Sequence, residues 1–285
     1  MATPVLIVGF GDLGSAVADL LVRQGLDVTG VRRARRQAAP GIQLIQADVT
    51  DAATLEPLSS AKPEILLYCV AADAQTDDSY KSQYVDGLRH VLAALQSCPS
   101  LRHVFFVSST RVYGQQTDDW LDEDSPAQPA DFGGRRLLEA ESLLQGLLVP
   151  ATVLRLSGIY GPGRTRMLQL AKTPQAWPPN NGWTNRIHRD DAAAFIANCA
   201  KRVGEGMELA PLYLVTDSRP APQHEVLCWL AARQGVECES VPLPPVAGGK
   251  RLSNRRLLNS GFQLRYPDYE TGYGELLNAA TRLSR

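Results

Sequence analysis

The 285-residue chain carries 29 basic and 30 acidic side chains, for a formal net charge of −1, and 44% of its residues are hydrophobic. This near-neutral balance argues against a general binder of nucleic acid or anionic membranes, and no apolar run approaches the roughly 20 residues of a membrane span. A globular composition at this length excludes a disordered chain. It favours one large domain, or one domain with a smaller lobe.

The five cysteines show neither CxxC pairs nor the clustered spacing of a zinc site, so no metal site is predicted. Their odd number favours free thiols in a reducing compartment. The sequence begins without a basic n-region or an apolar stretch long enough for a signal peptide. We therefore expect a cytoplasmic protein.

The first part of the sequence alternates short apolar runs with helical patterns, as βαβ units do. Strands are predicted at 5–8, 28–31, 42–45 and 65–70. Between the first two, apolar residues recur at helical spacing up to Gly25, and Thr50 or Asp51 can cap a short helix before the fourth. These runs predict an α/β fold with a Rossmann-like, doubly wound parallel sheet.

A long helix is predicted over 79–96, because its apolar side chains step by three and four residues. Further on we expect strands at 104–107, 153–156 and 212–215 and helices at 135–147, 192–199, 223–234, 254–259 and 270–283. After the Gly161-Pro162-Gly163 turn the sequence becomes richer in Pro, Asn and Trp. We place a boundary there. Residues 1–163 form a dinucleotide-binding domain, and residues 164–285 form a smaller mixed C-terminal lobe, of which about 185–218 returns to the sheet.

A glycine-rich turn stands between the first predicted strand and the first predicted helix. It reads Gly9-Phe10-Gly11-Asp12-Leu13-Gly14 and fits the GxGxxG pattern. In such turns the first glycine permits a tight bend, the second lets the backbone approach a pyrophosphate, and the third lets helix and strand pack closely. We expect this turn to hold a dinucleotide; a glycine-rich turn without a ligand is the alternative.

The end of the second predicted strand carries Arg32 and Arg33, followed by Arg35 and Arg36. NAD sites usually place an acidic residue about 20 residues after the glycine turn, whereas an arginine there accommodates a 2′-phosphate. Arg32 and Arg33 therefore favour NADP over NAD. We interpret Arg35 and Arg36 as a solvated basic loop.

Further segments follow in an order that resembles the extended short-chain dehydrogenase/reductases, the NAD-dependent epimerase/dehydratase group. They are Asp48-Val49, Val70-Ala71-Ala72, Tyr84-Val85-Asp86-Gly87, Val107-Ser108-Ser109-Thr110-Arg111-Val112-Tyr113-Gly114, the segment from Leu154 to Gly163, and Ile187-His188-Arg189-Asp190-Asp191. The resemblance extends over nearly the whole chain. It implies that Asp48 and Val49 contact the adenine, and that Val70, Ala71, Ala72 and Ser108 line the path of the cofactor.

Members of this family use the tyrosine of a YxxxK motif as general acid–base and its lysine to hold the nicotinamide ribose. The aligned residues here are Phe132 and Arg136, and none of the five lysines has a tyrosine four residues before it. A phenyl ring has no proton to exchange, and a guanidinium stays protonated. By the resemblance, Ser109 orients the substrate and Arg136 holds the ribose. Tyr113, Tyr160 or water would move the proton, although Ser109 and both tyrosines also have purely structural interpretations.

Three other segments each have a functional and a structural interpretation. His188 is a second candidate proton donor, although its segment mainly joins the lobes in the resembling family. The acidic run from Asp118 to Asp124 is interpreted as a solvated loop rather than a metal site. The stretch from Trp177 to Trp183 is a candidate substrate wall or lid, and it equally suits packing between lobes.

The leading hypothesis is an NADP(H)-binding, epimerase/dehydratase-like oxidoreductase with a non-standard catalytic set, acting on a nucleotide sugar or a small carbonyl compound. The alternative is a catalytically inactive protein that senses NADPH or a nucleotide. The expected partner is a small-molecule substrate, with neither nucleic acid nor membrane. A homodimer through the helices at 79–96 and 135–147 is also expected, unless both helices spend their apolar faces on the sheet.

Overall fold

A computed structural model describes residues 2–34, 37, 39–117, 119–238 and 241–283. Arg35, Arg36 and Asp118, which the sequence places in two charged loops, lie outside the described residues. The chain forms two compact units. The first comprises Met1–Gly114, Ala127–Arg155 and Ala193–Tyr213, and the second comprises Gln115–Pro126, Leu156–Ala192 and Leu214–Arg285.

The central sheet has seven strands in the order β11-β7-β5-β4-β1-β2-β3. These are β1 (Pro4–Val8), β2 (Asp27–Arg32), β3 (Ile42–Gln46), β4 (Ile65–Tyr68), β5 (His103–Ser109), β7 (Ala151–Leu156) and β11 (Leu212–Val215). The pairings from β3 through β2, β1 and β4 to β5 are all parallel. The predicted α/β, Rossmann-like sheet is thus confirmed. Its strand order reverses at β1, where sheets of this kind bind ligands beyond the carboxyl ends of the strands.

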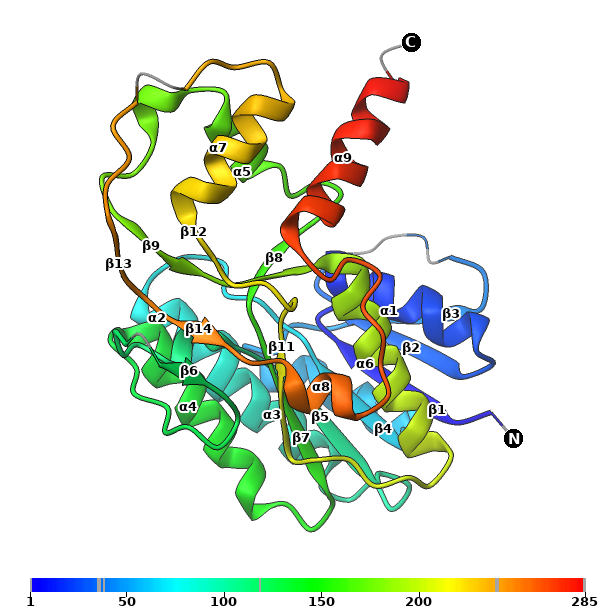
Figure 1. The fold of residues 1–285 in the computed structure, drawn as a ribbon. Helices are drawn as coiled ribbons and strands as arrows, with labels where there is room; N and C mark the ends of the chain where they lie inside the picture. The colour runs from blue at the N-terminus through cyan, green and yellow to red at the C-terminus, as the bar shows by residue number, and fades with distance from the viewer. Residues whose placement is uncertain (1, 35–36, 38, 118, 239–240, 284–285) are drawn as a thin grey trace. The chain divides into compact units, whose positions relative to one another are not determined.

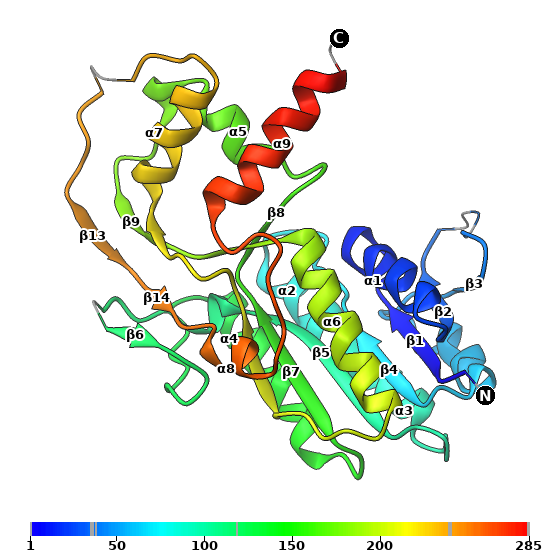
Figure 2. The same ribbon diagram turned by 45° about the vertical axis from the view of Figure 1, so that its right-hand side comes forward.

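Helices cover both faces of this sheet. Helix α1 (Asp12–Arg23) and most of α6 (Arg189–Gly204) lie on one face, and α3 (Gly87–Leu95) and α4 (Phe132–Leu143) lie on the other (Figures 1 and 2). The 3₁₀ helix η1 (Ala52–Ala61) packs beside α3, and the Asp51 carboxylate caps it by accepting from the Ala53 N–H. Two covered faces explain why β1 and β4 are apolar along almost their whole length.

The helix predicted over 79–96 is interrupted. Helix α2 (Asp77–Tyr80) runs into a π-helical turn, η2 (Lys81–Asp86), before α3 begins. The Tyr68 hydroxyl, on β4, donates to the Gln83 carbonyl, which a regular helix would offer to the N–H of Gly87. A Cβ on Gly87 would lie 2.6 Å from the Tyr68 hydroxyl, so only glycine admits this contact. The irregular turn therefore follows from a contact distant in the sequence.

Among its described residues, the second unit has three small sheets. Strand β8 (Gly158–Tyr160) pairs with β10 (Arg186–His188), β6 (Trp120–Leu121) pairs with β14 (Arg251–Leu252), and β9 (Asn181–Thr184) lies between β12 (Ala221–Pro222) and β13 (Val246–Gly249). Its helices are α5 (Arg166–Ala171), α7 (Gln223–Arg233), α8 (Arg255–Asn259) and α9 (Tyr269–Leu283). Trp177, a candidate substrate wall, lies in the hydrophobic core of this unit and donates its indole N–H to the Leu170 carbonyl.

None of the helices in the described part of the chain combines the length and the hydropathy that a membrane crossing needs.

Candidate functional site

The glycine turn after β1 contains two glycines that no other residue can replace. Gly9 has a φ of +99°, and a Cβ there would lie 2.6 Å from the main chain of Cys69 and Val70. A Cβ on Gly14 would lie 2.4 Å from the Gly9 carbonyl oxygen. Gly11 differs, because a Cβ on it would meet no atom within 4 Å. Gly9 and Gly14 thus fix the turn, while Gly11 leaves its backbone open to a close approach.

The same turn presents the beginning of helix α1. Its backbone is held from below, because the N–H groups of Gly9 and Phe10 donate to the Val31 carbonyl at 3.3 and 3.0 Å. The Phe10 ring is buried over Gly30, and Leu13, in the first turn of α1, is also buried. Gly11 stands at the N-cap position without a side-chain cap, while Gly11 and Asp12 are exposed. Uncapped N–H groups and the helix dipole at such a terminus suit an anion such as a pyrophosphate.

The two arginines at the end of β2 differ in their contacts. Arg33 forms an ion pair with Asp73 through two hydrogen bonds of 2.6 and 2.7 Å, and this pairing lowers the pKa of the Asp73 carboxyl. Arg32 is half-buried, and its Nε is buried without a hydrogen-bond partner among the described residues. Of the two, Arg32 is therefore the one that keeps a buried donor unused.

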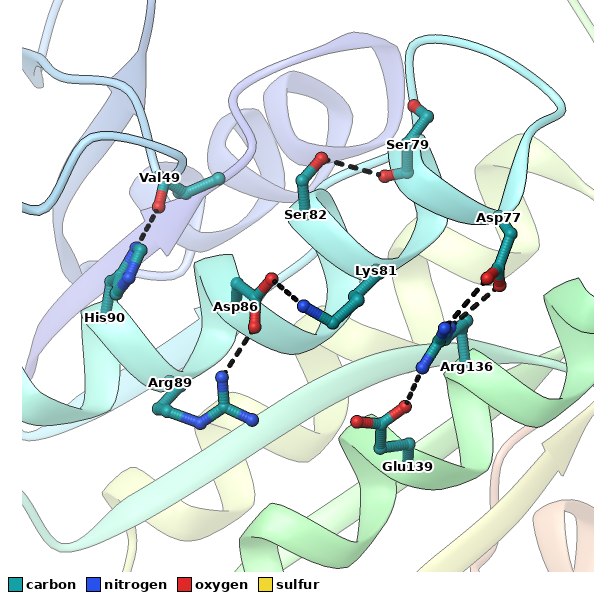
Figure 3. Close-up of polar contacts among 10 residues, drawn as sticks. All are labelled: Val49, Asp77, Ser79, Lys81, Ser82, Asp86, Arg89, His90, Arg136 and Glu139. Atoms are coloured by element: carbon teal, nitrogen blue, oxygen red, sulfur yellow. Dashed lines mark hydrogen bonds and ion pairs between the residues drawn. The ribbon is translucent and has the colours of Figure 1, made fainter.

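The residues predicted to contact the adenine lie at the same edge of the sheet. Asp48 accepts the N–H and the hydroxyl of Thr50 on one carboxylate oxygen, at 2.9 and 2.8 Å. The carbonyl of Val49 lies 2.9 Å from the His90 ring nitrogen Nδ1 (Figure 3). At the end of β4, the main chain of Val70 abuts the glycine turn, and Ala71 is exposed. The structure thus brings these predicted cofactor residues into one region, at the carboxyl ends of β1, β3 and β4.

Helix α4 begins at Phe132, three residues before the predicted start. The Asp131 carboxylate caps it by accepting the Gly134 N–H at 2.9 Å. Arg136 lies on its first turns and binds Asp77 through two hydrogen bonds of 2.8 Å and Glu139 through a third of 2.7 Å (Figure 3). These contacts raise the pKa of Arg136 and lower that of Asp77. Each guanidinium nitrogen of Arg136 therefore already donates to a carboxylate.

Ser109 and Ser108, at the end of β5, point to different partners. The Ser109 hydroxyl accepts the Arg111 N–H at 3.2 Å and caps the 3₁₀ turn η3 (Thr110–Val112). The buried Ser108 hydroxyl donates to Glu141, on α4, at 2.6 Å. The Ser108 hydroxyl is therefore directed toward α4, whereas the Ser109 hydroxyl remains beside the turn that follows β5.

Tyr113 belongs to the buried network under α4. Its ring has no exposed surface, and its hydroxyl accepts from Arg155 at 2.6 Å. Arg155 in turn forms an ion pair with Glu141 at 2.6 Å, and both side chains are about nine-tenths buried. The hydroxyl of Tyr113 thus accepts a hydrogen bond from the arginine of a buried ion pair.

Tyr160 and His188 pack together in the second unit. The Tyr160 ring is 3% exposed and lies 4.3 Å from the Tyr273 ring, centroid to centroid, and burial raises the pKa of its hydroxyl. The His188 ring lies 3.9 Å from that of Tyr266, and burial lowers the pKa of this imidazole. Asp191 accepts the N–H groups of Arg265 and Tyr266. These side chains form a packed internal cluster of this unit.

The structure adds two residues that the sequence did not single out. The Arg111 guanidinium packs against the rings of Tyr80 and Phe132, at 5.0 and 5.2 Å from their centroids. It donates to the Tyr80 hydroxyl at 2.7 Å and to Asp131 at 2.9 Å. Arg111 stands two residues after Ser109, which is a signal that could have been followed. Tyr80 carries no comparable signal, because it is far from Arg111 in the sequence.

Two carboxylates of the acidic run accept hydrogen bonds from backbone N–H groups. Asp122 accepts the N–H groups of Asp124 and Ser125, and Glu123 accepts the N–H of Leu214. Within the described ranges, no group of three or more His, Cys, Asp and Glu side chains is arranged to hold a metal ion.

The sequence matches the family model described as "NAD dependent epimerase/dehydratase family" over residues 5–177. No curated protein matches the chain.

Several solved structures resemble it over its length. A Methylobacillus flagellatus protein, whose assignment as an NAD-dependent epimerase/dehydratase is itself provisional, is 51% identical, with a TM-score of 0.89 and coverage of 99% of this chain and 100% of that one. Bordetella bronchiseptica WbmG, solved with NAD and UDP, is 21% identical, with a TM-score of 0.81 and coverage of 99% and 96%. Thermotoga maritima UDP-glucose 4-epimerase, solved with UDP-glucose, is 18% identical, with a TM-score of 0.79 and coverage of 99% and 99%. At the two lower identities, the likeness is one of fold.

Proposed function

Because the chain belongs to the NAD dependent epimerase/dehydratase family, we propose that it is an NADP(H)-binding oxidoreductase of the epimerase/dehydratase type. Its substrate is a nucleotide sugar or a small carbonyl compound. The observation that supports this most directly is the glycine turn after β1, with its two obligatory glycines, the open Gly11 and the uncapped beginning of α1. The division into a dinucleotide-binding part, 1–163, and a substrate lobe, 164–285, and the cytoplasmic location belong to the same proposal.

The residues present fit a dinucleotide. The Gly11 backbone and the α1 N-terminus would hold the pyrophosphate, Asp48 and Val49 the adenine, and Arg32 a 2′-phosphate. When bound, the cofactor supplies the acceptor and donor of hydride. The Ser109 hydroxyl would hydrogen-bond the substrate oxygen. Arg136 would reach the ribose by giving up its contact with Asp77 or with Glu139.

The choice of cofactor depends on Arg32. WbmG and Thermus thermophilus UDP-glucose 4-epimerase were solved with NAD, whereas an arginine at the end of β2 supports NADP here. In calorimetric titrations we expect NADPH to bind at least about tenfold more tightly than NADH, which is about 1.4 kcal/mol. Arg32→Ala should remove most of this preference. Arg33→Ala should retain it, because Asp73 already occupies Arg33. Equal affinities of the wild-type protein for both cofactors would rule out the 2′-phosphate contact.

The names of the relatives support a nucleotide sugar as substrate. One of them was solved with UDP and another with UDP-glucose. UDP-glucose and UDP-galactose are therefore the first probes, with their interconversion followed by chromatography in the presence of NAD⁺ or NADP⁺. A homodimer through the helices at 79–96 and 135–147 would be tested by light scattering on the same preparation.

The second candidate function is that of an inactive sensor of NADPH or of a nucleotide. Phe132 and the fully engaged Arg136 favour it, because neither offers the proton relay of the YxxxK pair. A sensor would bind the dinucleotide and leave it unreduced and unoxidised with every carbonyl and nucleotide-sugar probe. Turnover by the wild-type protein on any of these probes would eliminate this candidate.

A further inference from the structure

Tyr80 places a phenol beside the ring that lacks one. The rings of Tyr80 and Phe132 meet edge to face, with 5.5 Å between their centroids. Tyr80 is the last residue of α2, and its ring also contacts that of Tyr84 at 5.2 Å. The side chain is 7% exposed. A hydroxyl is therefore present next to the position at which the family carries its catalytic tyrosine.

The Arg111 guanidinium places a positive charge beside this hydroxyl. Its Nη1 donates to the Tyr80 oxygen at 2.7 Å, while its Nε donates to both carboxylate oxygens of Asp131 at 2.9 and 3.0 Å. A Cβ on Gly133 would lie 2.6 Å from the guanidinium carbon, so the glycine after Phe132 makes room for the arginine. Arg111 is thus fixed on three sides, by a carboxylate, by two rings and by the first turn of α4.

Tyr80 and Arg111 lie near the carboxyl ends of the sheet strands, where α/β folds usually bind their ligands. Arg111 follows the carboxyl end of β5 by two residues, and Ser109, at that strand end, accepts the Arg111 N–H. Gln75, which follows β4, is exposed and completes the group. Its side-chain oxygen lies 3.2 Å from the Tyr80 oxygen and 2.8 Å from Arg111 Nη1. An amide oxygen thus occupies a position between phenol and guanidinium that a substrate carbonyl oxygen could take.

We propose that Tyr80 is the proton-transferring phenol of this site and that Arg111 is the cation that supports it. They stand in for the tyrosine and lysine whose positions are held by Phe132 and Arg136. This inference rests on the proposed function. It also accounts for the engagement of Arg136 by Asp77 and Glu139, because the cation beside the phenol is supplied by η3 and not by α4.

The transfers balance. As a substrate alcohol becomes a ketone, its hydroxyl proton passes to the Tyr80 oxygen in the phenolate form, and its C–H hydrogen leaves as hydride to the oxidised nicotinamide dinucleotide. Reduction of the ketone returns the hydride and the Tyr80 proton to the substrate. Arg111 donates to the Tyr80 oxygen throughout and exchanges no proton, since a guanidinium stays protonated.

A crystal structure of the wild-type protein with NAD⁺ or NADP⁺ tests the placement without any knowledge of the substrate. We expect the Tyr80 and Ser109 hydroxyls to share hydrogen-bonding reach, about 2.6–3.2 Å, of one point beside the nicotinamide C4. No other phenol should reach that point. A bound cofactor with Tyr80 out of reach would overturn the inference and leave the proposed function standing. A protein that binds neither cofactor would contradict the proposed function itself.

Kinetics with UDP-glucose and UDP-galactose test the role. Tyr80→Phe should lower kcat by about 10²- to 10⁴-fold, the usual contribution of general acid–base catalysis, with KM and cofactor affinity nearly unchanged. Tyr213→Phe is the control, since it removes another buried phenol oxygen, one that accepts the Ala210 N–H away from this group of residues, and should leave kcat unchanged. In the Tyr80→Phe background, Phe132→Tyr should restore part of kcat. A Tyr80→Phe enzyme within threefold of an active wild type would overturn the inference.

Discussion

The glycine turn after β1 and the first turn of α4 constrain the sequence in different ways. In the turn, backbone geometry decides: Gly9 and Gly14 each meet main-chain atoms within 2.6 Å of any added Cβ, so substitution is blocked. At α4 the side chains decide. In the exchange that we propose, Phe132 and Arg136 hold the YxxxK positions, and Tyr80 and Arg111, from other elements, supply the phenol and the cation. A site that depends on backbone approach must keep its residues, whereas one that depends on side-chain chemistry can move them.

Substitution in the turn should give the largest effect. Gly9→Ala forces an alanine to a φ of +99° and puts its Cβ 2.6 Å from the backbone of Cys69 and Val70. Strain of about 1–2 kcal/mol and overpacking of about 1–3 kcal/mol should lower the free energy of unfolding by roughly 4 kcal/mol in urea titrations. Gly11→Ala is the matched control, because its Cβ meets nothing within 4 Å. Equal stability of the two variants would contradict this account of the turn.

Removal of the α4 cap should have an intermediate effect. Asp131→Ala deletes the acceptor for the Gly134 N–H and one anchor of Arg111, and should cost about 1–2 kcal/mol, most of it from the lost cap because the ion pair with Arg111 is itself partly exposed. Asp51→Ala removes only a cap, that of η1, and should cost about 1 kcal/mol or less. An Asp131→Ala protein as stable as the Asp51→Ala protein would mean that the contact with Arg111 adds nothing.

The Asp131 cap also predicts a pH dependence. Partial burial raises the pKa of Asp131, but the Gly134 N–H and the Arg111 guanidinium outweigh it, so the pKa lies below its ordinary value. The stabilisation by this carboxylate is therefore present above about pH 4 and is lost as the pH falls through the lowered pKa. Urea midpoints measured between pH 5 and pH 2 should fall less steeply for Asp131→Asn than for the wild type. Parallel curves would show that Asp131 does not titrate in this way.

The smallest effect is expected at Arg136. Its partners Asp77 and Glu139 are substantially exposed, and exposed ion pairs contribute little because water screens them. Arg136→Met should leave the urea midpoint within error of the wild type, as should Arg89→Met, which removes a more exposed arginine paired with Asp86 (Figure 3). A loss as large as that of Asp131→Ala would show that α4 needs Arg136 to form.

Many features of the fold are determined by residues close together in the sequence, and others depend on contacts between distant residues. Strands, glycine turn and most helices could be predicted, because hydrophobic spacing and glycine positions act over a few residues. The π-helical turn could not, since it depends on the Tyr68 hydroxyl reaching the Gln83 carbonyl. Nor could the short pairing of β6 with β14, which only tertiary contacts create.

The same limit applies to the candidate site. Asp131 is a preferred N-cap residue type, and it places the start of α4 at Phe132, a local signal that the prediction of a helix from Arg135 overlooked. The burial of Tyr113 depends on the Arg155–Glu141 pair, and the contact between Tyr80 and Arg111 joins two elements. Such contacts between distant segments carry no periodic signal.

The central claim is that this glycine turn binds a dinucleotide, and its most direct test is a calorimetric titration of NADPH into the wild-type protein and Gly11→Val. The open space at Gly11 admits a side chain without loss of fold, but that side chain would occupy the place where a pyrophosphate meets the backbone. We predict saturable binding at one site per chain in the wild type, and binding weaker by tenfold or more in a variant of similar stability. Equal binding by the two proteins, or none by either, would contradict the account.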